Sequence, residues 1–274
     1  MGSEMCIRDS NNDIFADIVN VLLFDGESEV EENELVNTTV HSQYKAEDGK
    51  VHEQERDIAK YWKRGCTDIV LYGIENQTKV EKRMPARISG YEGASYRGQY
   101  DKKTIVPVIT MVLYYGTDRK WTAPKNLKSL IKVPDNLDKY VNDTKANVFE
   151  IAWLTDEQIA KFTSDYKIVA NFFVNKRKNK DYIPDDKTTI KHVDEILKFL
   201  SVMTGDNRYQ EILSDKEGVS NMCDVAQRLE DRGIEKGLQK GREEGNQMIY
   251  SLVEDESISC LLYTSPSPRD PKTS

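Results

Sequence analysis

The chain has 274 residues, of which 38% are hydrophobic and 31% charged, and its formal net charge is −8. This length is enough for one core of about 150 residues and an appendage, and the composition is that of a soluble globular protein. The charge excludes a protein that binds nucleic acid through an overall positive charge, so a phosphate-binding surface would have to be a local group of cations.

Both ends of the chain differ from the rest. Residues 1–10 and 260–274 resemble translated sequencing-adapter sequence, and a natural disordered end is the alternative. Setting them aside removes Cys6 and Cys260 and leaves Cys66 and Cys223, too few for a disulfide scaffold or a cysteine-based zinc site. No segment reaches the roughly 18 uninterrupted apolar residues of a membrane span. We therefore expect a cytoplasmic protein that makes no membrane contact.

The first predicted element is a helix from Asp13 to Phe24, because its apolar residues recur at helical spacing. Asp17 and Asn20 lie on another face, where they are either solvated or able to hydrogen-bond or to extend the metal shell. Residues 31–55 are polar and irregular in pattern, so we expect weak strands or a loop there. The element that follows carries Asp57, which begins either a strand or a helix.

The most informative segment is the apolar run that starts at Asp68 and ends in Glu75, Asn76 and Gln77. Alternation along a strand points Glu75 and Gln77 to the same face. A buried strand that ends in a carboxylate and an amide is typical of metal-dependent phosphodiesterases, so this segment predicts half of a nuclease site. The alternative is a strand-end salt bridge between Glu75 and a nearby cation, Arg87 or Lys79.

A metal site needs a second carboxylate near Glu75, and the upstream candidates are Asp57 and Asp68. Asp68 lies seven residues before Glu75 on the same strand, about 23 Å away at roughly 3.3 Å per residue, whereas Mg²⁺ binds oxygen at about 2.1 Å. Asp57 precedes a turn predicted at residues 63–65, which can fold it back beside Glu75. Asp57 is therefore the better ligand.

The remaining pattern alternates strands and helices. It predicts a helix entered through Pro85, strands at Val106–Tyr115 and Ala146–Trp153, and helices at Asp156–Lys176 and Lys187–Val202. This order predicts an α/β core at residues 11–155, a helical lobe at 156–220 and a charged tail at 221–259.

Several short motifs follow one another in a fixed order: Phe15-Ala16-Asp17-Ile18-Val19-Asn20, Arg56-Asp57, Gly73-Ile74-Glu75-Asn76-Gln77, Met84-Pro85-Ala86-Arg87, Tyr91, Tyr96-Arg97-Gly98-Gln99 and the run 107–116. From about Asn11 to Trp121, and more loosely to about Met248, the chain resembles the bacterial recombination-promoting nuclease or YhgA-like transposase family of the PD-(D/E)XK nuclease superfamily. The resemblance implies a restriction-endonuclease-like core, with a mixed central sheet flanked by helices, and a helical C-terminal region.

By this resemblance Asp57 and Glu75 bind the metal, Mg²⁺ or Mn²⁺, and Gln77 occupies the position of the superfamily's lysine. A lysine stabilises an attacking hydroxide by its charge, whereas neutral Gln77 can only orient water or a phosphate oxygen by hydrogen bonding. Lys79 or Lys82 is a candidate for the missing charge.

The sequence therefore predicts a metal-dependent DNA endonuclease of recombination or transposition. The alternative is a catalytically inactive DNA- or protein-binding module that keeps the fold, and a weaker one is an integrase-type transposase, which needs three acids. Predicted DNA-contacting or site-bracing residues are Asn20, Lys79, Arg87, Tyr96 and Gln99, with packing as the alternative for the last two. The cations expected around the site are Lys79, Lys82, Arg83, Arg87, Arg97, Lys102 and Lys103.

Four glycines recur every four residues in the charged tail: Gly233, Gly237, Gly241 and Gly245. Each costs about 1 kcal/mol of helix propensity, a cost that close helix contact in a homo-oligomer would justify. A flexible or repeat-prone tail is the alternative.

Overall fold

The computed structural model describes residues 11–38, 41–45, 51–55, 57–215 and 217–254. The adapter-like ends, with Cys6 and Cys260, lie outside these residues. The chain divides into two compact units, with the boundary in the sequence between Ala226 and Gln227. Residues 11–155 and 156–220, predicted as core and helical lobe, both fall within the first unit.

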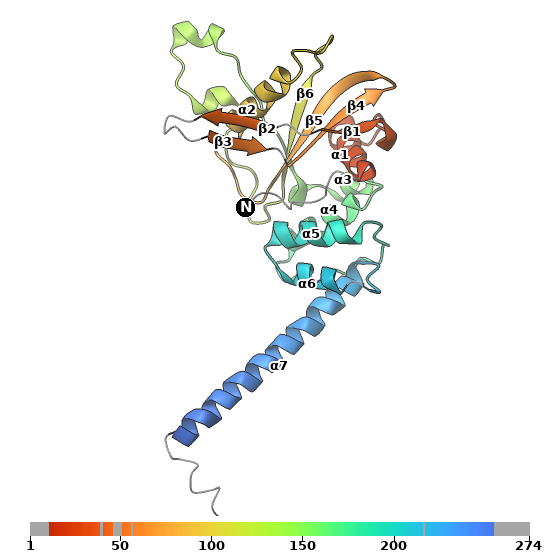
Figure 1. Ribbon diagram of the computed structural model, residues 1–274, viewed down its shortest axis with the longest axis vertical. Coiled ribbons are helices and arrows are strands. Elements are labelled where there is room, and N and C mark those ends of the chain that lie inside the picture. The colour runs from red at the N-terminus through yellow and green to blue at the C-terminus, as the bar shows by residue number, and fades with distance from the viewer. Residues whose placement is uncertain (1–10, 39–40, 46–50, 56, 216, 255–274) are drawn as a thin grey trace, which may run out of the picture. The chain divides into compact units, whose positions relative to one another are not determined.

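The first unit contains a five-stranded mixed sheet in the order β1-β4-β5-β6-β7 (Figure 1). The antiparallel strands are β1 (Leu35–Asn37), β4 (Ile58–Arg64) and β5 (Thr67–Gln77). The parallel strands β6 (Val108–Tyr114) and β7 (Asn147–Glu150) continue from β5. A separate ribbon pairs β2 (His41–Lys45) with β3 (Val51–Glu55). Because helices flank this sheet, the predicted α/β nuclease-like fold class is confirmed.

Strands β4 and β5 form the hairpin that carries the predicted acids. The chain turns where it was predicted to, and Gly65 supplies the positive φ of 62° that a residue with a side chain rarely adopts. The register shifts between Trp62 and Lys63, because Trp62 pairs with Val70 while Lys63 pairs with Asp68. Ile69 is therefore an extra residue in β5, a β-bulge.

Helix α1 (Asn12–Phe24) covers one face of the sheet, and its Phe15 ring lies 6.4 Å from the ring of Tyr72 on β5. Helices α4 (Tyr166–Lys178) and α5 (Val193–Thr204) add to this side, where Phe173 and Phe199 contact the buried ring of Tyr115. These aromatic side chains form an apolar layer on this face of the sheet.

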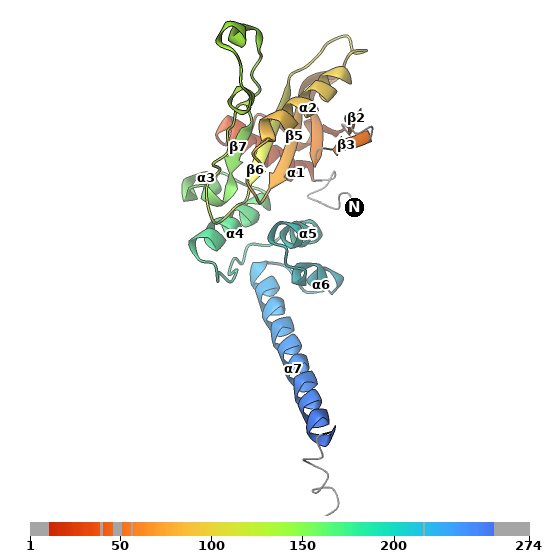
Figure 2. The same cartoon turned by 90° about the vertical axis from the view of Figure 1, so that its left-hand side faces the viewer.

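Helix α2 (Met84–Arg97) covers the opposite face, and Pro85 lies in its first turn as predicted. Met84 and Ile88 pack with Val112 and Tyr114 of β6. Figure 2 shows α2 in front of the sheet and α1 behind it. Since helices cover both faces, residues 70–75 of β5 are all buried.

The other elements follow the predicted order, and two of their boundaries differ from the prediction by three residues or more. The predicted strand to Trp153 ends at Glu150, and Ile151–Trp153 form a 3₁₀ turn. Helix α5 begins at Val193 rather than near Lys187, because the backbone N–H groups of Lys191 and His192 donate to Asp165. The other helices are α3 (Asp156–Ala160), α6 (Arg208–Ser214) and α7 (Met222–Glu254), with 3₁₀ turns at Glu32–Glu34, Leu127–Leu130 and Asp135–Tyr140.

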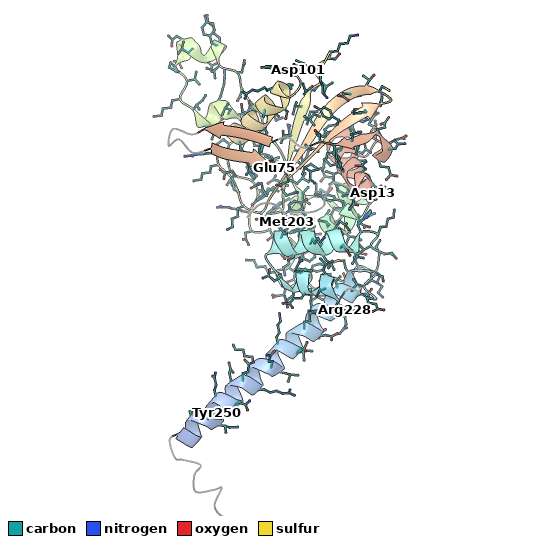
Figure 3. All side chains as sticks on the ribbon, viewed as in Figure 1. Asp13, Glu75, Asp101, Met203, Arg228 and Tyr250 are labelled. Carbon is teal, nitrogen blue, oxygen red and sulfur yellow. The ribbon has the colours of Figure 1, made fainter. Side chains whose placement is uncertain are left out.

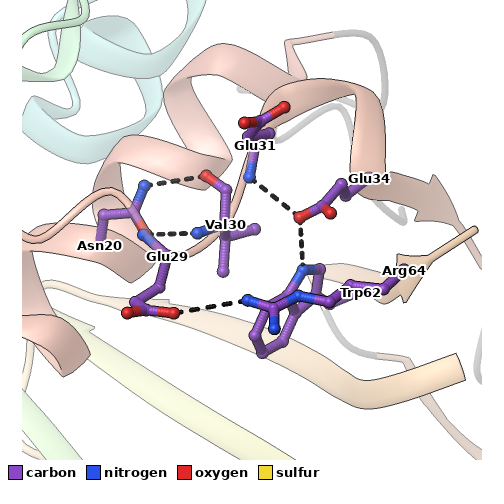
Figure 4. Close-up of polar contacts among 7 residues, drawn as sticks. All are labelled: Asn20, Glu29, Val30, Glu31, Glu34, Trp62 and Arg64. Atoms are coloured by element: carbon purple, nitrogen blue, oxygen red, sulfur yellow. Dashed lines mark hydrogen bonds and ion pairs between the residues drawn. The ribbon is translucent and has the colours of Figure 1, made fainter.

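The polar residues of α1 are buried rather than solvated. Asp17, 8% exposed, accepts hydrogen bonds from the backbone N–H and the hydroxyl of both Thr163 and Ser164. Asn20, 9% exposed, exchanges two 2.9 Å hydrogen bonds with the backbone of Val30 (Figure 4). A solvated polar face was therefore the wrong expectation, because these side chains join α1 to two loops.

Helix α7 lies mostly in the second unit. Its four glycines are helical, and a Cβ added at any of them would meet nothing within 4 Å. The oligomer contact through this helix stays a prediction. None of the helices in the described part of the chain combines the length and the hydropathy of a membrane-spanning segment.

Asp17→Ala should lower the free energy of unfolding by about 2–4 kcal/mol, because it leaves buried donors of Thr163 and Ser164 without their charged acceptor. Urea unfolding measures the change. Glu27→Ala is the control, since it removes an exposed acid that closely follows the same helix and has no positive φ. Equal losses in both variants would contradict the structural role of Asp17.

Candidate functional site

The register of the β4–β5 hairpin makes Asp57 and Glu75 neighbours. Ile58 pairs with Ile74, so the position before Ile58 lies across from Glu75. Asp57 directly precedes β4, and its Oδ2 accepts a 2.7 Å hydrogen bond from the backbone N–H of Asn76. The acid thus stands at the start of a strand, one of the two predicted settings. It lies beside the segment that carries Glu75.

Glu75 points to the face covered by α2, where Arg87 contacts it, and is 0% exposed. Its Oε2 lies 2.9 Å from Nη2 of Arg87, whose side chain is 35% exposed. The salt bridge with Arg87, expected as an alternative to a metal site, is therefore present. Lys79, the other cation expected as a partner, is exposed beyond the end of β5.

Tyr91 completes this cluster from the next turn of α2. Its hydroxyl accepts a 2.7 Å hydrogen bond from Nε of Arg87. Burial and the charge of Glu75 raise the pKa of Tyr91 to about 12, so its hydroxyl stays protonated at neutral pH. The sequence motif contained Tyr91, but no role was predicted for it. Its separation of four residues from Arg87 on one helix was the available signal.

Arg87 is the electrostatic centre of the cluster. Burial by itself would lower its pKa, but Glu75, then Tyr91, then the charge of Asp57 raise the pKa above its usual value. Arg87 therefore stays charged and interacts with both predicted acids.

Gln77 is the last residue of β5 and is half-buried. Strand alternation places its side chain on the face of Glu75, and its backbone carbonyl accepts from the N–H of Tyr115 at 2.8 Å. Lys79 and Lys82, the candidates for a missing positive charge, follow in the exposed loop before α2.

Three other predicted residues form hydrogen bonds with the backbone. Gln99, 0% exposed, exchanges hydrogen bonds with the backbone of Val106, and the hydroxyl of Tyr96 accepts from the N–H of Val108. They fix the entry of β6. Gln99 has no exposed surface, which fits the packing role expected as the alternative, and its contact with DNA stays a prediction. The side-chain amide of Asn20 likewise exchanges hydrogen bonds with the backbone of Val30.

The expected group of cations is divided between the two ends of the sheet. Lys102 lies 2.7 Å from Asp68, which also pairs with Lys63 at 3.1 Å. Asp68 is near the start of β5, about 23 Å from Glu75 at roughly 3.3 Å per residue. Figure 3 likewise shows Asp101, the neighbour of Lys102, far from Glu75. The expectation that Lys102 surrounds the site was wrong.

The donor set at the site fits one hard cation. Mg²⁺ commonly binds one or two carboxylates, several waters and a substrate phosphate, so Asp57 and Glu75 supply enough protein ligands. Within the described part of the chain, no group of three or more Asp, Glu, His or Cys side chains could hold a metal. The three acids of an integrase-type centre are thus not found among these residues.

The fold and the site define an α/β protein with an acid–arginine cluster at the end of a buried strand. Residues 63–201 match the family described as "Putative transposase, YhgA-like". Since the match covers just over half of the 274 residues, the chain belongs to this family, as its motifs predicted. Searches of curated proteins and of solved structures gave no significant match.

Asp68→Asn should reduce stability at neutral pH by at most about 1 kcal/mol, because its partners are partly exposed. The hydrogen bond from Lys102, and to a smaller extent Lys63, lowers the pKa of Asp68 below its unfolded value of about 3.9. The stabilisation is therefore present above that value and lost as the pH falls through the lower folded pKa. Urea unfolding between pH 6 and pH 2 should show the wild type and variant converge; a constant difference would contradict this.

Proposed function

We propose that this member of a transposase family is a metal-dependent DNA endonuclease that acts in recombination or transposition. The observation that carries the proposal is the pairing register, by which Asp57 and Glu75 meet across the β4–β5 hairpin. Two carboxylates brought together from separate strands, beside an arginine, are a suitable set for phosphodiester hydrolysis.

Each residue then has a chemical task. Asp57 and Glu75 would hold Mg²⁺ or Mn²⁺, which when bound lowers the pKa of a coordinated water and neutralises charge on the scissile phosphate. The Gln77 amide would orient the attacking water by hydrogen bonding. The partly exposed guanidinium of Arg87 suits a phosphate oxygen. Hydrolysis would leave one hydroxyl and one phosphate end.

A local positive charge supports a DNA substrate despite the acidic total. Residues 79–87 contain four cations and one acid, Glu81, a net charge of +3. Lys79, Lys82 and Arg83 in this segment are exposed and directly follow the strand that carries Glu75. A cationic segment of this kind can contact DNA phosphates while the rest of the protein remains acidic.

Purified protein with Mg²⁺ or Mn²⁺ should nick or cut plasmid DNA, and both Asp57→Ala and Glu75→Ala should abolish the cutting. We expect a loss well beyond the 10–100-fold that outer-shell substitutions at metal sites cost, because each change removes a direct ligand. Supercoiled plasmid and gel electrophoresis provide the assay.

Asp68→Ala is the matched control, because this acid on the same strand pairs with Lys63 and Lys102 at the far end. It should cut at nearly the wild-type rate. Wild-type cutting by Asp57→Ala and Glu75→Ala would refute the proposed site.

A catalytically inactive DNA-binding module is the second candidate. Two observations favour it, since Gln77 is neutral and Arg87 already matches the charge of Glu75. Calorimetry separates the two functions: the endonuclease should bind Mn²⁺, whereas DNA binding without any divalent-ion binding would select the inactive module.

A further inference from the structure

Arg87 already provides the positive charge that a metal would bring to Glu75. Its Nη2 lies 2.9 Å from Oε2 of a carboxylate that is fully buried. A buried carboxylate needs a partner of opposite charge, because desolvation without one is strongly unfavourable. A divalent cation that binds Glu75 must therefore compete with this guanidinium.

The contacts of Arg87 allow it to move without leaving the site. Its side chain is 35% exposed, so a direct path leads to solvent. Tyr91 holds it from the same helix, by the 2.7 Å hydrogen bond and with the ring centre 5.5 Å from the guanidinium carbon. The hydrogen bond fixes the guanidinium in its orientation toward Glu75, whereas the ring face can retain Arg87 near the site after the contact with Glu75 is broken.

We propose that Arg87 is an exchangeable counter-ion: it neutralises Glu75 until a divalent cation binds, and it then turns to the DNA phosphate. This inference rests on the proposed function and adds an order of events to it. Metal binding and substrate binding become coupled through one side chain.

The charges around the site support this exchange. The formal charges of Asp57 and Glu75 sum to −2, and both acids act electrostatically on Arg87. A divalent cation neutralises both acids without the help of Arg87. The site then has a net charge of +1, which is the charge of Arg87. A phosphate of the DNA backbone carries the single negative charge that restores neutrality.

Arg87→Gln should therefore bind Mn²⁺ more tightly than the wild type, by about fivefold or more in calorimetry, the lower end of typical coupling between sites. Without metal this variant should melt at a lower temperature, because Glu75 loses its partner. Mn²⁺ should raise its melting temperature by about 5 °C more than that of the wild type. Its plasmid cutting should nevertheless be slower, because the phosphate contact is lost.

Arg83→Gln is the matched control, since it removes an equal charge from an exposed position just before the same helix. Its melting temperature should respond to Mn²⁺ like that of the wild type. Glu75→Gln combined with Arg87→Gln removes both charges of the ion pair, so it should recover stability without metal and lose the response to Mn²⁺.

Tyr91→Phe keeps every charge and tests the inference if Arg87→Gln does not fold. It removes one hydrogen bond that holds Arg87, so Mn²⁺ binding should tighten by about two- to tenfold.

Equal or weaker Mn²⁺ binding by Arg87→Gln, or by Tyr91→Phe where that variant is used, would overturn the exchange. Mn²⁺ binding by the wild type would then still support the proposed metal function. Failure of the wild type and all variants to bind Mn²⁺ would instead overturn both proposals.

Discussion

A fully buried carboxylate at the end of a strand constrains everything around it. Burying the charge of Glu75 costs several kcal/mol unless a partner compensates it. Arg87 provides that charge from the first turns of α2, and Tyr91 fixes the guanidinium from one turn further on. The helix must therefore begin close to the end of β5, and the short loop 78–83 and Pro85 allow it to do so. The cluster therefore connects β5, the loop 78–83 and α2.

The second acid depends on a single irregularity in the sheet. The bulge at Ile69 shifts the register of the hairpin by one residue, and this shift places Asp57 across from Glu75. Without it Asp57 would oppose Ile74 and point to the α1 face, because opposite residues of an antiparallel pair share a face. The local geometry of the hairpin thus decides whether the two carboxylates meet.

Local patterns were sufficient to predict most elements of the fold. Apolar periodicity predicted α1 and β5, Gly65 predicted the hairpin turn, and Pro85 predicted the start of α2. The register could not be predicted, because a bulge leaves no signal in the order of residues 63–70. The burial of Asp17 and Asn20 was missed because their partners, Thr163 and Val30, come from other segments of the chain. The positions of Asp57 and Glu75 agree with the prediction, whereas the place of Lys102 depends on a tertiary contact with Asp68 that spacing does not reveal.

The central claim is that Asp57 and Glu75 share one divalent cation, and anomalous diffraction from crystals grown with Mn²⁺ tests it most directly. We predict one strong anomalous peak bound by both carboxylates, with the Arg87 guanidinium moved away from Glu75. A map with no peak between these side chains, and with Arg87 still paired to Glu75 at saturating Mn²⁺, would contradict the account.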